Sequence, residues 1–303
     1  MKKSTVLRKL SLRLVLLATI IIAFSFGCAN FSISQSVQPS ANAPPMRSTL
    51  HWKSSDSATV SPTEVLLDPS SSAITPEDIV WEMIGQINID GALNNLQALT
   101  GESPICINNE CYTIKNRLTG SEGLGWAKQY IYKEISNLGF SVEFRDWSRS
   151  GRSDQNIVIR KPGALHPEEE IYFVAHLDGV GGSSEVSYPG ADDNASGVVD
   201  ILELARVLSH YSFSRTIVLL ITTGEEQGTL GSQSYLSQLT PIELSSIKYV
   251  VNLDMLGYDA NQDGVMELWH GGHAPSIELV NTMSEIIQAY QLDLSPGFVV
   301  GCG

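Results

Sequence analysis

Acidic residues and a histidine recur at the carboxyl ends of three apolar segments, and another acidic pair precedes an amphipathic segment. The candidate residues, in chain order, are His176, Asp178, Asp193, Glu225, Glu226 and Asp254. An imidazole together with several carboxylates suits a borderline cation such as zinc, which accepts both nitrogen and oxygen ligands. Without a cation the grouping would be unfavourable, because like charges a few ångströms apart force one another to take up protons. These residue types therefore predict a metal site if the fold brings them together.

Each of these residues also has an ordinary structural explanation when it is taken alone. A histidine after a strand is usually a hydrogen-bonded loop residue. Asp192 and Asp193 would suit a turn or a helix cap, and Glu225 with Glu226 would suit the solvated start of a helix. The repetition of one arrangement after three successive apolar segments favours a shared site over these separate explanations.

Short apolar runs that alternate with amphipathic stretches predict the elements that must position these residues. We expect strands at Phe140–Trp147, Asn156–Arg160, Ile171–Ala175, Thr216–Thr222, Tyr249–Leu253 and Val265–Trp269. We expect helices at Ile79–Ile87, Gly91–Leu99, Ser121–Gly139, Ala195–Leu208, Gly231–Leu239 and Ser276–Tyr290. The predicted fold class is α/β, with a mixed, mostly parallel central sheet covered by helices on both faces. Open sheets of this class bind ligands beyond the carboxyl ends of their strands, where the candidate residues would meet.

Four short motifs occur in the same order as in a known enzyme family. They are AHLD at Ala175–Asp178, GADDNASG at Gly190–Gly197, GEE at Gly224–Glu226 and NLDM at Asn252–Met255. The segment Arg117–Ser121 is also similar to the family's sequence before its first large helix. On these motifs the chain, from about residue 75 to its end, resembles the zinc aminopeptidases of the aminopeptidase Y and bacterial leucyl aminopeptidase type. The resemblance implies the fold of the di-zinc exopeptidases.

The same resemblance implies two co-catalytic zinc ions. Carried over by position, His176 and Asp254 would bind the first ion and Glu226 would bind the second. Asp193 would bridge the two ions. Two cations lower the pKa of a water molecule between them and polarise a peptide carbonyl, which agrees with hydrolysis of a peptide bond.

The resemblance further implies that Glu225 is the general base. It would take a proton from the metal-bridging water during attack on the peptide carbonyl and pass it to the leaving amine. Asp178 would hold the imidazole of His176 in its ligating tautomer. The implied function is that of a zinc-dependent aminopeptidase, whose partners are peptides with a free N-terminus.

One part of the family pattern has no counterpart in this sequence. The family's fifth metal ligand, a histidine, follows the segment that Pro296–Gly303 resembles, and this chain ends at Gly303. We therefore expect the peptidase domain to be C-terminally incomplete and to bind its second zinc ion weakly. His270 and His273 lie after a different strand, and we do not expect either to replace the missing ligand.

Two other functions stay open. A catalytically impaired exported binding domain would keep the fold, but an idle site would have no physical reason to retain the ligands together with Glu225. A glutaminyl cyclase-like enzyme with a single zinc ion is the second alternative, although the loop Thr223–Gly228 is more similar to that of the peptidases. A calcium-stabilised module fits less well, because calcium prefers oxygen ligands to an imidazole such as that of His176.

The composition narrows the range of partners. The 303 residues are 43% hydrophobic and carry a net charge of -14, which is typical of an acidic globular protein. Binding to nucleic acid needs a basic surface, so the charge argues against nucleic acid as a partner. Surplus carboxylates are compatible with substrates that carry a free α-amino group.

The N-terminal segment has the features of an export signal. Basic residues precede the apolar run Leu14–Phe26, which is too short to span a bilayer. The expected domains are a signal peptide at 1–29, a Ser/Pro-rich linker at 30–74 and a zinc peptidase domain at 75–303. Cleavage after Ala29 would give a secreted or periplasmic protein, and we favour it. Lipid attachment to Cys28, or an uncleaved signal, would instead hold the protein at a membrane.

The cysteines give a first testable prediction. Of the four, only Cys106 and Cys111 could close a short loop with each other, and in an oxidising compartment we expect them to form a disulfide. Two free thiols in a loop are the alternative. Peptide mapping with and without reduction should find the two cysteines linked, and recovery of both as free thiols in the exported protein would contradict the prediction.

Overall fold

The structure is a computed structural model that describes residues 76–180, 187–259, 263–292 and 294–301. The expected signal peptide, the linker and Cys28 lie outside these ranges. The described elements are α2 (Pro76–Gly85), α3 (Ile89–Thr100), β1 (Ile105–Ile107), β2 (Glu110–Tyr112), α4 (Glu122–Asn137), β3 (Val142–Arg149), β4 (Arg152–Lys161), β5 (His166–His176), η2 (Ala191–Ser196), α5 (Gly197–Leu208), β6 (Arg215–Thr222), α6 (Leu230–Gln238), α7 (Pro241–Ser246), β7 (Ile247–Asn252), β8 (Val265–His270), α8 (Ala274–Ala289) and β9 (Ser295–Val300). Most correspond to an element predicted from the sequence, whereas β1, β2, η2, α7 and β9 do not. None of the helices in these ranges has the length and apolar character needed to cross a membrane.

A five-stranded mixed sheet lies at the centre of the fold, in the strand order β3-β4-β6-β5-β7. β5 pairs in parallel with β6 and with β7, so that Phe173 lies opposite Leu219 on one side and Val251 on the other. β3 and β4 are antiparallel because a two-residue turn joins them, in which Ser150 and Gly151 both have positive φ. The predicted mixed sheet is confirmed, but parallel pairs do not predominate in it, because the two pairs around β5 are parallel and the two around β4 are antiparallel.

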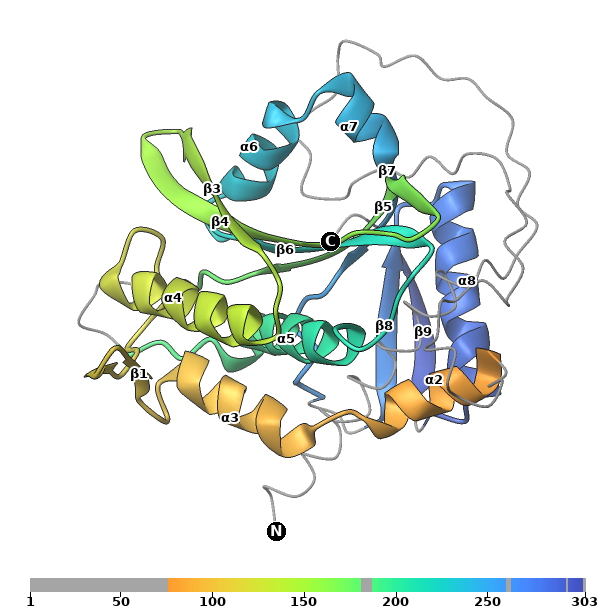
Figure 1. Cartoon of the computed structure of the whole chain (residues 1–303), viewed down its shortest axis with the longest axis horizontal. Coiled ribbons are helices and arrows are strands. Elements are labelled where there is room, and N and C mark those ends of the chain that lie inside the picture. Colours follow the sequence, from red (N-terminus) through yellow and green to blue (C-terminus); the bar gives the residue numbers. More distant parts are fainter. Residues whose placement is uncertain (1–75, 181–186, 260–262, 293, 302–303) are drawn as a thin grey trace.

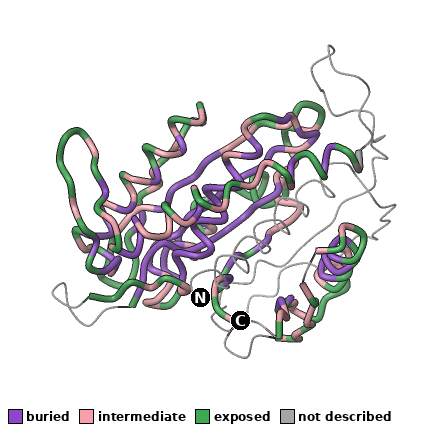
Figure 2. Tube along the Cα trace, turned by 90° about the horizontal axis from the view of Figure 1, so that it is seen from below, coloured by how far each residue is buried: buried purple, intermediate pink, exposed green. Residues whose placement is uncertain are grey.

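Alternate residues of the strands face two separate hydrophobic layers. On β5, Ile171 and Phe173 belong to the larger core, which also contains residues of α3, α4 and α5. Tyr172 and Val174 face the other way and join a smaller core with Tyr235 of α6. Figure 1 shows α3, α4 and α5 on one side of the sheet and α6 and α7 on the other. Figure 2 shows the buried residues in the interior of the molecule and the exposed ones mainly along its outer segments. The predicted cover of the sheet on both faces is confirmed by the two hydrophobic layers.

A second, two-stranded sheet is separate from the central one. In it β8 and β9 pair in parallel, starting with Val265 opposite Ser295, and α8 packs on both strands. Tyr290, directly after α8, meets Trp81 of α2 edge to face, with ring centroids 5.2 Å apart. The sequence predicts β8 at nearly its observed position but gives no sign that it pairs outside the central sheet.

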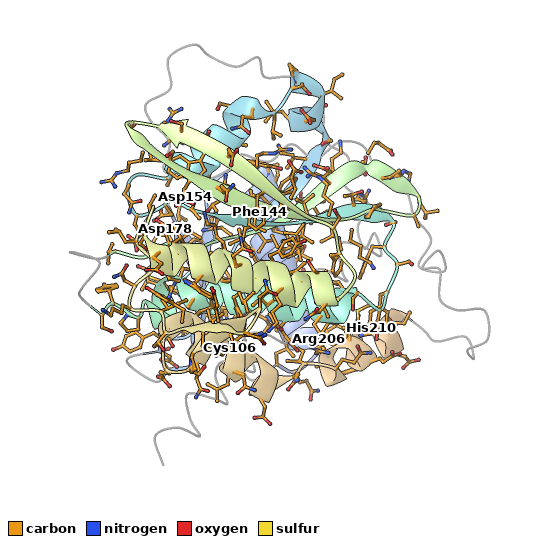
Figure 3. All side chains as sticks on the ribbon, turned by 60° about the vertical axis from the view of Figure 1, so that its left-hand side comes forward. Cys106, Phe144, Asp154, Asp178, Arg206 and His210 are labelled. Atoms are coloured by element: carbon orange, nitrogen blue, oxygen red, sulfur yellow. A yellow bond between two sulfur atoms is a disulfide. The ribbon has the colours of Figure 1, made fainter. Side chains whose placement is uncertain are left out.

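The β1–β2 hairpin carries the predicted disulfide. Cys106, labelled in Figure 3, lies opposite Cys111, and their sulfur atoms are bonded at 2.04 Å. The intervening Asn108 and Asn109 both have positive φ, which a two-residue hairpin turn requires and asparagine tolerates. The predicted bridge is therefore confirmed, whereas the short strands around it were not predicted.

Replacing Phe173 by alanine tests the larger core. The ring is fully buried on the central strand β5, so its removal should lower the free energy of unfolding by about 3–5 kcal/mol. Glu168→Ala is the control on the same strand, because that side chain is 71% exposed, and its effect should stay below about 0.5 kcal/mol. Urea denaturation measures both variants, and similar small effects would contradict the burial of β5.

Candidate metal centre

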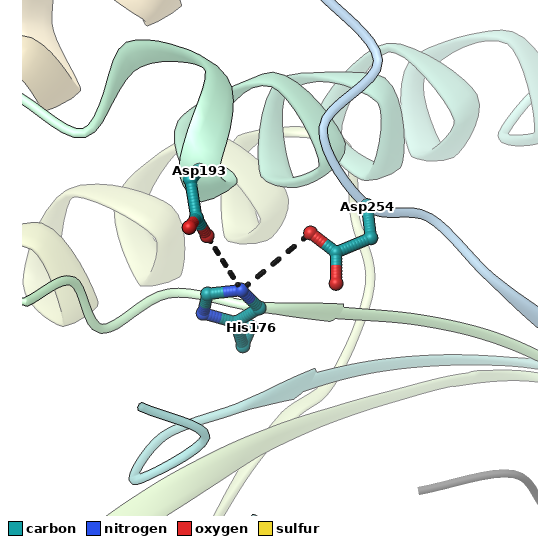
Figure 4. A group of neighbouring side chains, drawn as sticks. All are labelled: His176, Asp193 and Asp254. Atoms are coloured by element: carbon teal, nitrogen blue, oxygen red, sulfur yellow. Dashed lines mark ion pairs between the residues drawn. The ribbon is translucent and has the colours of Figure 1, made fainter. Parts of the chain in front are cut away.

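Three elements meet at one edge of the sheet and bring three of the predicted ligands together (Figure 4). β5 ends at His176, Asp193 lies in η2, and Asp254 is the second residue after β7. The parallel pairing of β7 with β5 fixes the position of Asp254, because Leu253 donates its N–H to the carbonyl of Val174 at 2.8 Å. The pairing of β7 with β5 therefore continues to the residue before Asp254.

His176, Asp193 and Asp254 have the spacing of metal ligands. Nε2 of His176 lies 3.1 Å from Oδ1 of Asp193 and 3.7 Å from Oδ1 of Asp254. One potential ligand atom from each residue lies within 4.8 Å of the others. The imidazole is only 4% exposed, whereas the carboxylates are 44% and 41% exposed. A cation could therefore reach the oxygens from solvent and meet a nitrogen that is fixed in the protein interior.

The tautomer of His176 suits ligation. Its Nδ1 lies 3.0 Å from the backbone carbonyl of Asp178, and because a carbonyl can only accept, Nδ1 carries a proton. Nε2 is therefore the nitrogen that faces Asp193 and Asp254. Burial lowers the pKa of His176, but hydrogen bonds to those two aspartates and the charge of Asp178 outweigh it and raise this pKa well above 6.5. A bound cation would take the place of the proton on Nε2.

The carboxylate of Asp178 organises the loop that carries both glutamates. It is fully buried and accepts the backbone N–H groups of Glu225 at 3.1 Å and Glu226 at 3.2 Å. Thr119 donates its hydroxyl to the same carboxylate at 3.3 Å. The sequence predicts that Asp178 orients His176, and in the structure its backbone carbonyl contacts the imidazole while its carboxylate is 3.8 Å away. One residue thus positions the histidine and the glutamate loop together.

Two residues that the sequence pattern did not single out hold the same loop from β3 and β4. Asn156 accepts the N–H of Thr223 at 3.1 Å and donates to the carbonyl of Gly231 at 2.9 Å. Trp147 donates its indole N–H to the hydroxyl of Thr223 at 2.8 Å, and its ring lies where a Cβ on Gly224 would approach to 2.6 Å. A polar residue at the start of an apolar strand is a signal that could have marked Asn156. Nothing in the sequence marks Trp147.

η2 is tied to the segment after β7, which fixes Asp193 relative to Asp254. Asn194 donates its side-chain amide to the carbonyl of the residue before Asp254 at 2.8 Å. The carboxylate of Asp192 accepts the N–H of Gly257 at 2.7 Å, so this residue joins two loops rather than capping a helix. The peptide bond between Asp193 and Asn194 is cis.

Both glutamates have raised pKa values. Burial is the largest cause for each, and the charge of Asp193 contributes further at Glu226, whose pKa rises to about 7. Oε1 of Glu226 is buried and has no hydrogen-bond partner among the residues that the structure describes. A buried oxygen of this kind needs a partner, and a cation beside Asp193 would supply one. The buried Glu226 oxygen is therefore a second observation that fits a bound metal ion, in addition to the group of His176, Asp193 and Asp254.

The structure thus brings some of the predicted site residues into one group and leaves others beside it. His176, Asp193 and Asp254 form the group, whereas Glu225 and Glu226 lie in the adjoining loop. Within the described ranges, the group does not include His270 or His273.

Comparison with known proteins gives the site a family context. Residues 156–295 match the sequence profile described as Peptidase family M28. The matched range runs from β4 to the first residue of β9 and includes every predicted site residue.

The chain is also similar to curated proteins. Aminopeptidase YwaD of Bacillus subtilis (strain 168) is 38% identical over 109 residues, which cover 36% of this chain and 23% of that protein. A probable zinc metalloprotease of Pyrenophora tritici-repentis (strain Pt-1C-BFP) is 37% identical over 211 residues, covering 63% of this chain and 47% of that protein. The chain therefore spans less than half the length of these relatives.

Solved structures share the fold. Legionella pneumophila LapA aminopeptidase matches with a TM-score of 0.58 and 22% identity, over 78% of this chain and 62% of that one. A glutaminyl cyclase from an Acidobacteriales bacterium matches with a TM-score of 0.56 and 14% identity, over 71% of this chain and 73% of that one. The profile match over residues 156–295 therefore identifies a peptidase family M28 domain in this chain, and the solved structures show that the fold is shared.

Proposed function

We propose that this chain is an exported zinc-dependent aminopeptidase that releases N-terminal residues from peptides. The observation that carries the proposal is the buried imidazole of His176, whose Nε2 faces the carboxylates of Asp193 and Asp254. The M28 domain and the relatives named as an aminopeptidase and a zinc metalloprotease support it. The proposed export rests on the basic and then apolar N-terminus of the sequence.

The residues of the site would hold two zinc ions. His176 and Asp254 would hold one ion, Glu226 would hold the other, and Asp193 would contact both, in keeping with the three-residue group and the buried Glu226 oxygen. Zinc, when bound, polarises a peptide carbonyl and makes a water molecule a stronger acid. The imidazole favours zinc over calcium or magnesium, which prefer oxygen ligands.

Glu225 is the residue best placed to move the proton. Asp178 fixes its backbone N–H, and its carboxyl group interacts electrostatically with His176 and Asp254. Glu225 accepts a proton from the attacking water and returns it to the leaving amine. Burial raises the pKa of Glu225, and nearby positive charge would lower it again, which favours the basic form at neutral pH.

The acidic character of the chain suits a substrate with a free α-ammonium group. A net charge of -14 favours the approach of cationic groups, and the exposed oxygens of Asp193 and Asp254 open to solvent at the site. Peptides with a free N-terminus are therefore the proposed substrates.

A catalytically silent binding domain of the same fold is the main alternative. Against it, a site without a ligand would have no physical reason to keep a buried oxygen on Glu226 that has no hydrogen-bond partner among the described residues. The likeness to a glutaminyl cyclase concerns the fold alone, at 14% identity. Release of p-nitroaniline from an aminoacyl anilide would identify a peptidase, whereas ammonia release from an N-terminal glutamine would identify a cyclase.

Glu225→Gln in the full 303-residue chain tests the proposed base. Glutamine keeps the shape of the side chain but cannot accept the proton, so kcat for an aminoacyl anilide should fall by about 10²- to 10⁴-fold while bound zinc is unchanged. Glu267→Gln, on the exposed surface of β8, is the matched control and should keep its activity. High activity in Glu225→Gln would contradict the assigned role, and loss of zinc would show that Glu225 is a ligand.

Zinc affinity should rise with pH across the neutral range. The pKa of His176 is raised well above 6.5 and that of Glu226 to about 7, so both groups hold protons that zinc must displace. For each proton that zinc displaces, the zinc affinity should rise roughly tenfold per pH unit as long as the pH is below the pKa of the group that held the proton. Competition with a chelator between about pH 6 and pH 8 measures this.

His166→Ala, at the opposite end of β5, is the control for that titration and should reproduce the curve of the unmodified protein. His176→Ala should bind zinc weakly at every pH. An affinity that does not change with pH would contradict the protonation states described for the metal-free site.

A further inference from the structure

Arg117 is a buried cation with an unusual set of partners. Its side chain is 1% exposed and donates four hydrogen bonds, all to backbone carbonyls. Nε contacts Leu177 at 2.8 Å, Nη1 contacts Leu99 and Pro189 at 2.7 Å each, and Nη2 contacts Gly190 at 2.8 Å. A buried charge is costly unless it is paired or fully hydrogen-bonded, so these four bonds are what make the burial tolerable.

The four carbonyls come from three separate parts of the chain. Leu99 lies near the end of α3, Leu177 directly follows β5, and Pro189 with Gly190 leads into η2. The planar guanidinium can hold these segments together because its donors point in fixed, divergent directions. Arg117 is therefore a cross-link between the end of α3 and two loops, which have no regular pairing with one another.

Two of those segments adjoin metal ligands. Leu177 is the residue after His176, and Gly190 lies three residues before Asp193. The guanidinium thus bonds to the backbone close to both His176 and Asp193, whose side chains lie 3.1 Å apart. A displacement of either carbonyl would change the separation between the imidazole and the bridging carboxylate.

Gly190 shows how closely the two sides approach. It has a φ of +50°, and a Cβ at this position would lie 2.5 Å from the carbonyl oxygen of Asp193 and 3.0 Å from Nη2 of Arg117. A side chain would therefore push against the guanidinium and the Asp193 backbone at once. Glycine is required here for the cross-link to form.

The charge of Arg117 also acts on the site. It interacts favourably with Asp178, Asp193 and Glu226, and although burial lowers its pKa to about 10, the group stays protonated at neutral pH. In the metal-free protein this positive charge offsets part of the repulsion among the carboxylates.

We propose that Arg117 is a positioning residue that holds Asp193 opposite His176 and so presets the metal site before an ion binds. The inference rests on the metal site of the proposed function but not on the reaction catalysed there. If Arg117 had a purely structural role, variants that lose the cross-link would bind zinc as well as other variants of equal stability. The proposed role predicts that they bind zinc more weakly than those variants.

The test compares zinc affinities of the full chain and its variants by chelator competition. Arg117→Lys keeps the charge but cannot span four carbonyls, and Gly190→Ala keeps the arginine but displaces its partner. Both should weaken zinc binding by about 10- to 100-fold. In the metal-free variants, hydrogen exchange at the amide of Ala195, which bonds to the Gly190 carbonyl at 3.1 Å, should become faster.

Three controls separate positioning from other effects. Arg152→Lys changes an exposed arginine, and Gly125→Ala adds a methyl group where no atom lies within 4 Å, so both should bind zinc normally. Ile131→Ala destabilises the larger core without touching the cross-link and should also keep its zinc affinity while it remains folded.

The outcomes decide the inference. Unchanged zinc affinity in Arg117→Lys would overturn it, as would weakening by the same factor in Ile131→Ala. If Arg117→Lys does not fold, Gly190→Ala decides, and unchanged affinity in that variant overturns the inference. Zinc binding by the unmodified chain without any hydrolysis would instead refute the proposed peptidase while leaving the role of Arg117 intact.

Discussion

The crowding of carboxylates around one imidazole is the constraint on which the rest of the structure depends. Asp193 and Asp254 meet His176 in one group, and Glu225 and Glu226 lie in the adjoining loop. Burial raises the pKa of Glu226 most, and the charge of Asp193 adds to the effect, so this pKa rises to about 7. Added positive charge relieves the conflict, which is why the site is best understood as a place for a cation.

The fold maintains this grouping by pairing buried charges with the backbone. The carboxylate of Asp178 accepts N–H groups from the glutamate loop, and the guanidinium of Arg117 donates to carbonyls around Asp193. In each case a buried ion fixes loops that lack strand pairing of their own. The parallel strands β5, β6 and β7 supply the common edge, and these two ions set the finer positions of the loops that leave it.

The strands and the site residues at their ends could be predicted from the sequence, because they depend on local patterns of residues. The ends of apolar runs mark where strands stop, and so His176, Glu225 and Asp254 could be placed at strand ends. The β1–β2 hairpin could not, since its three-residue strands carry no clear period. The separate pairing of β8 with β9 depends on which strands meet in space. The hydrogen-bond partners of Arg117 could not be predicted either, because they are backbone carbonyls, which every residue has.

Anomalous X-ray scattering from crystals of the zinc-loaded protein, measured on both sides of the zinc absorption edge, tests the central claim most directly. The account predicts a zinc peak about 2.0–2.2 Å from Nε2 of His176 and from carboxylate oxygens of Asp193 and Asp254. A zinc-loaded crystal with no peak between these residues, or with its strongest peak at His270 or His273, would contradict it.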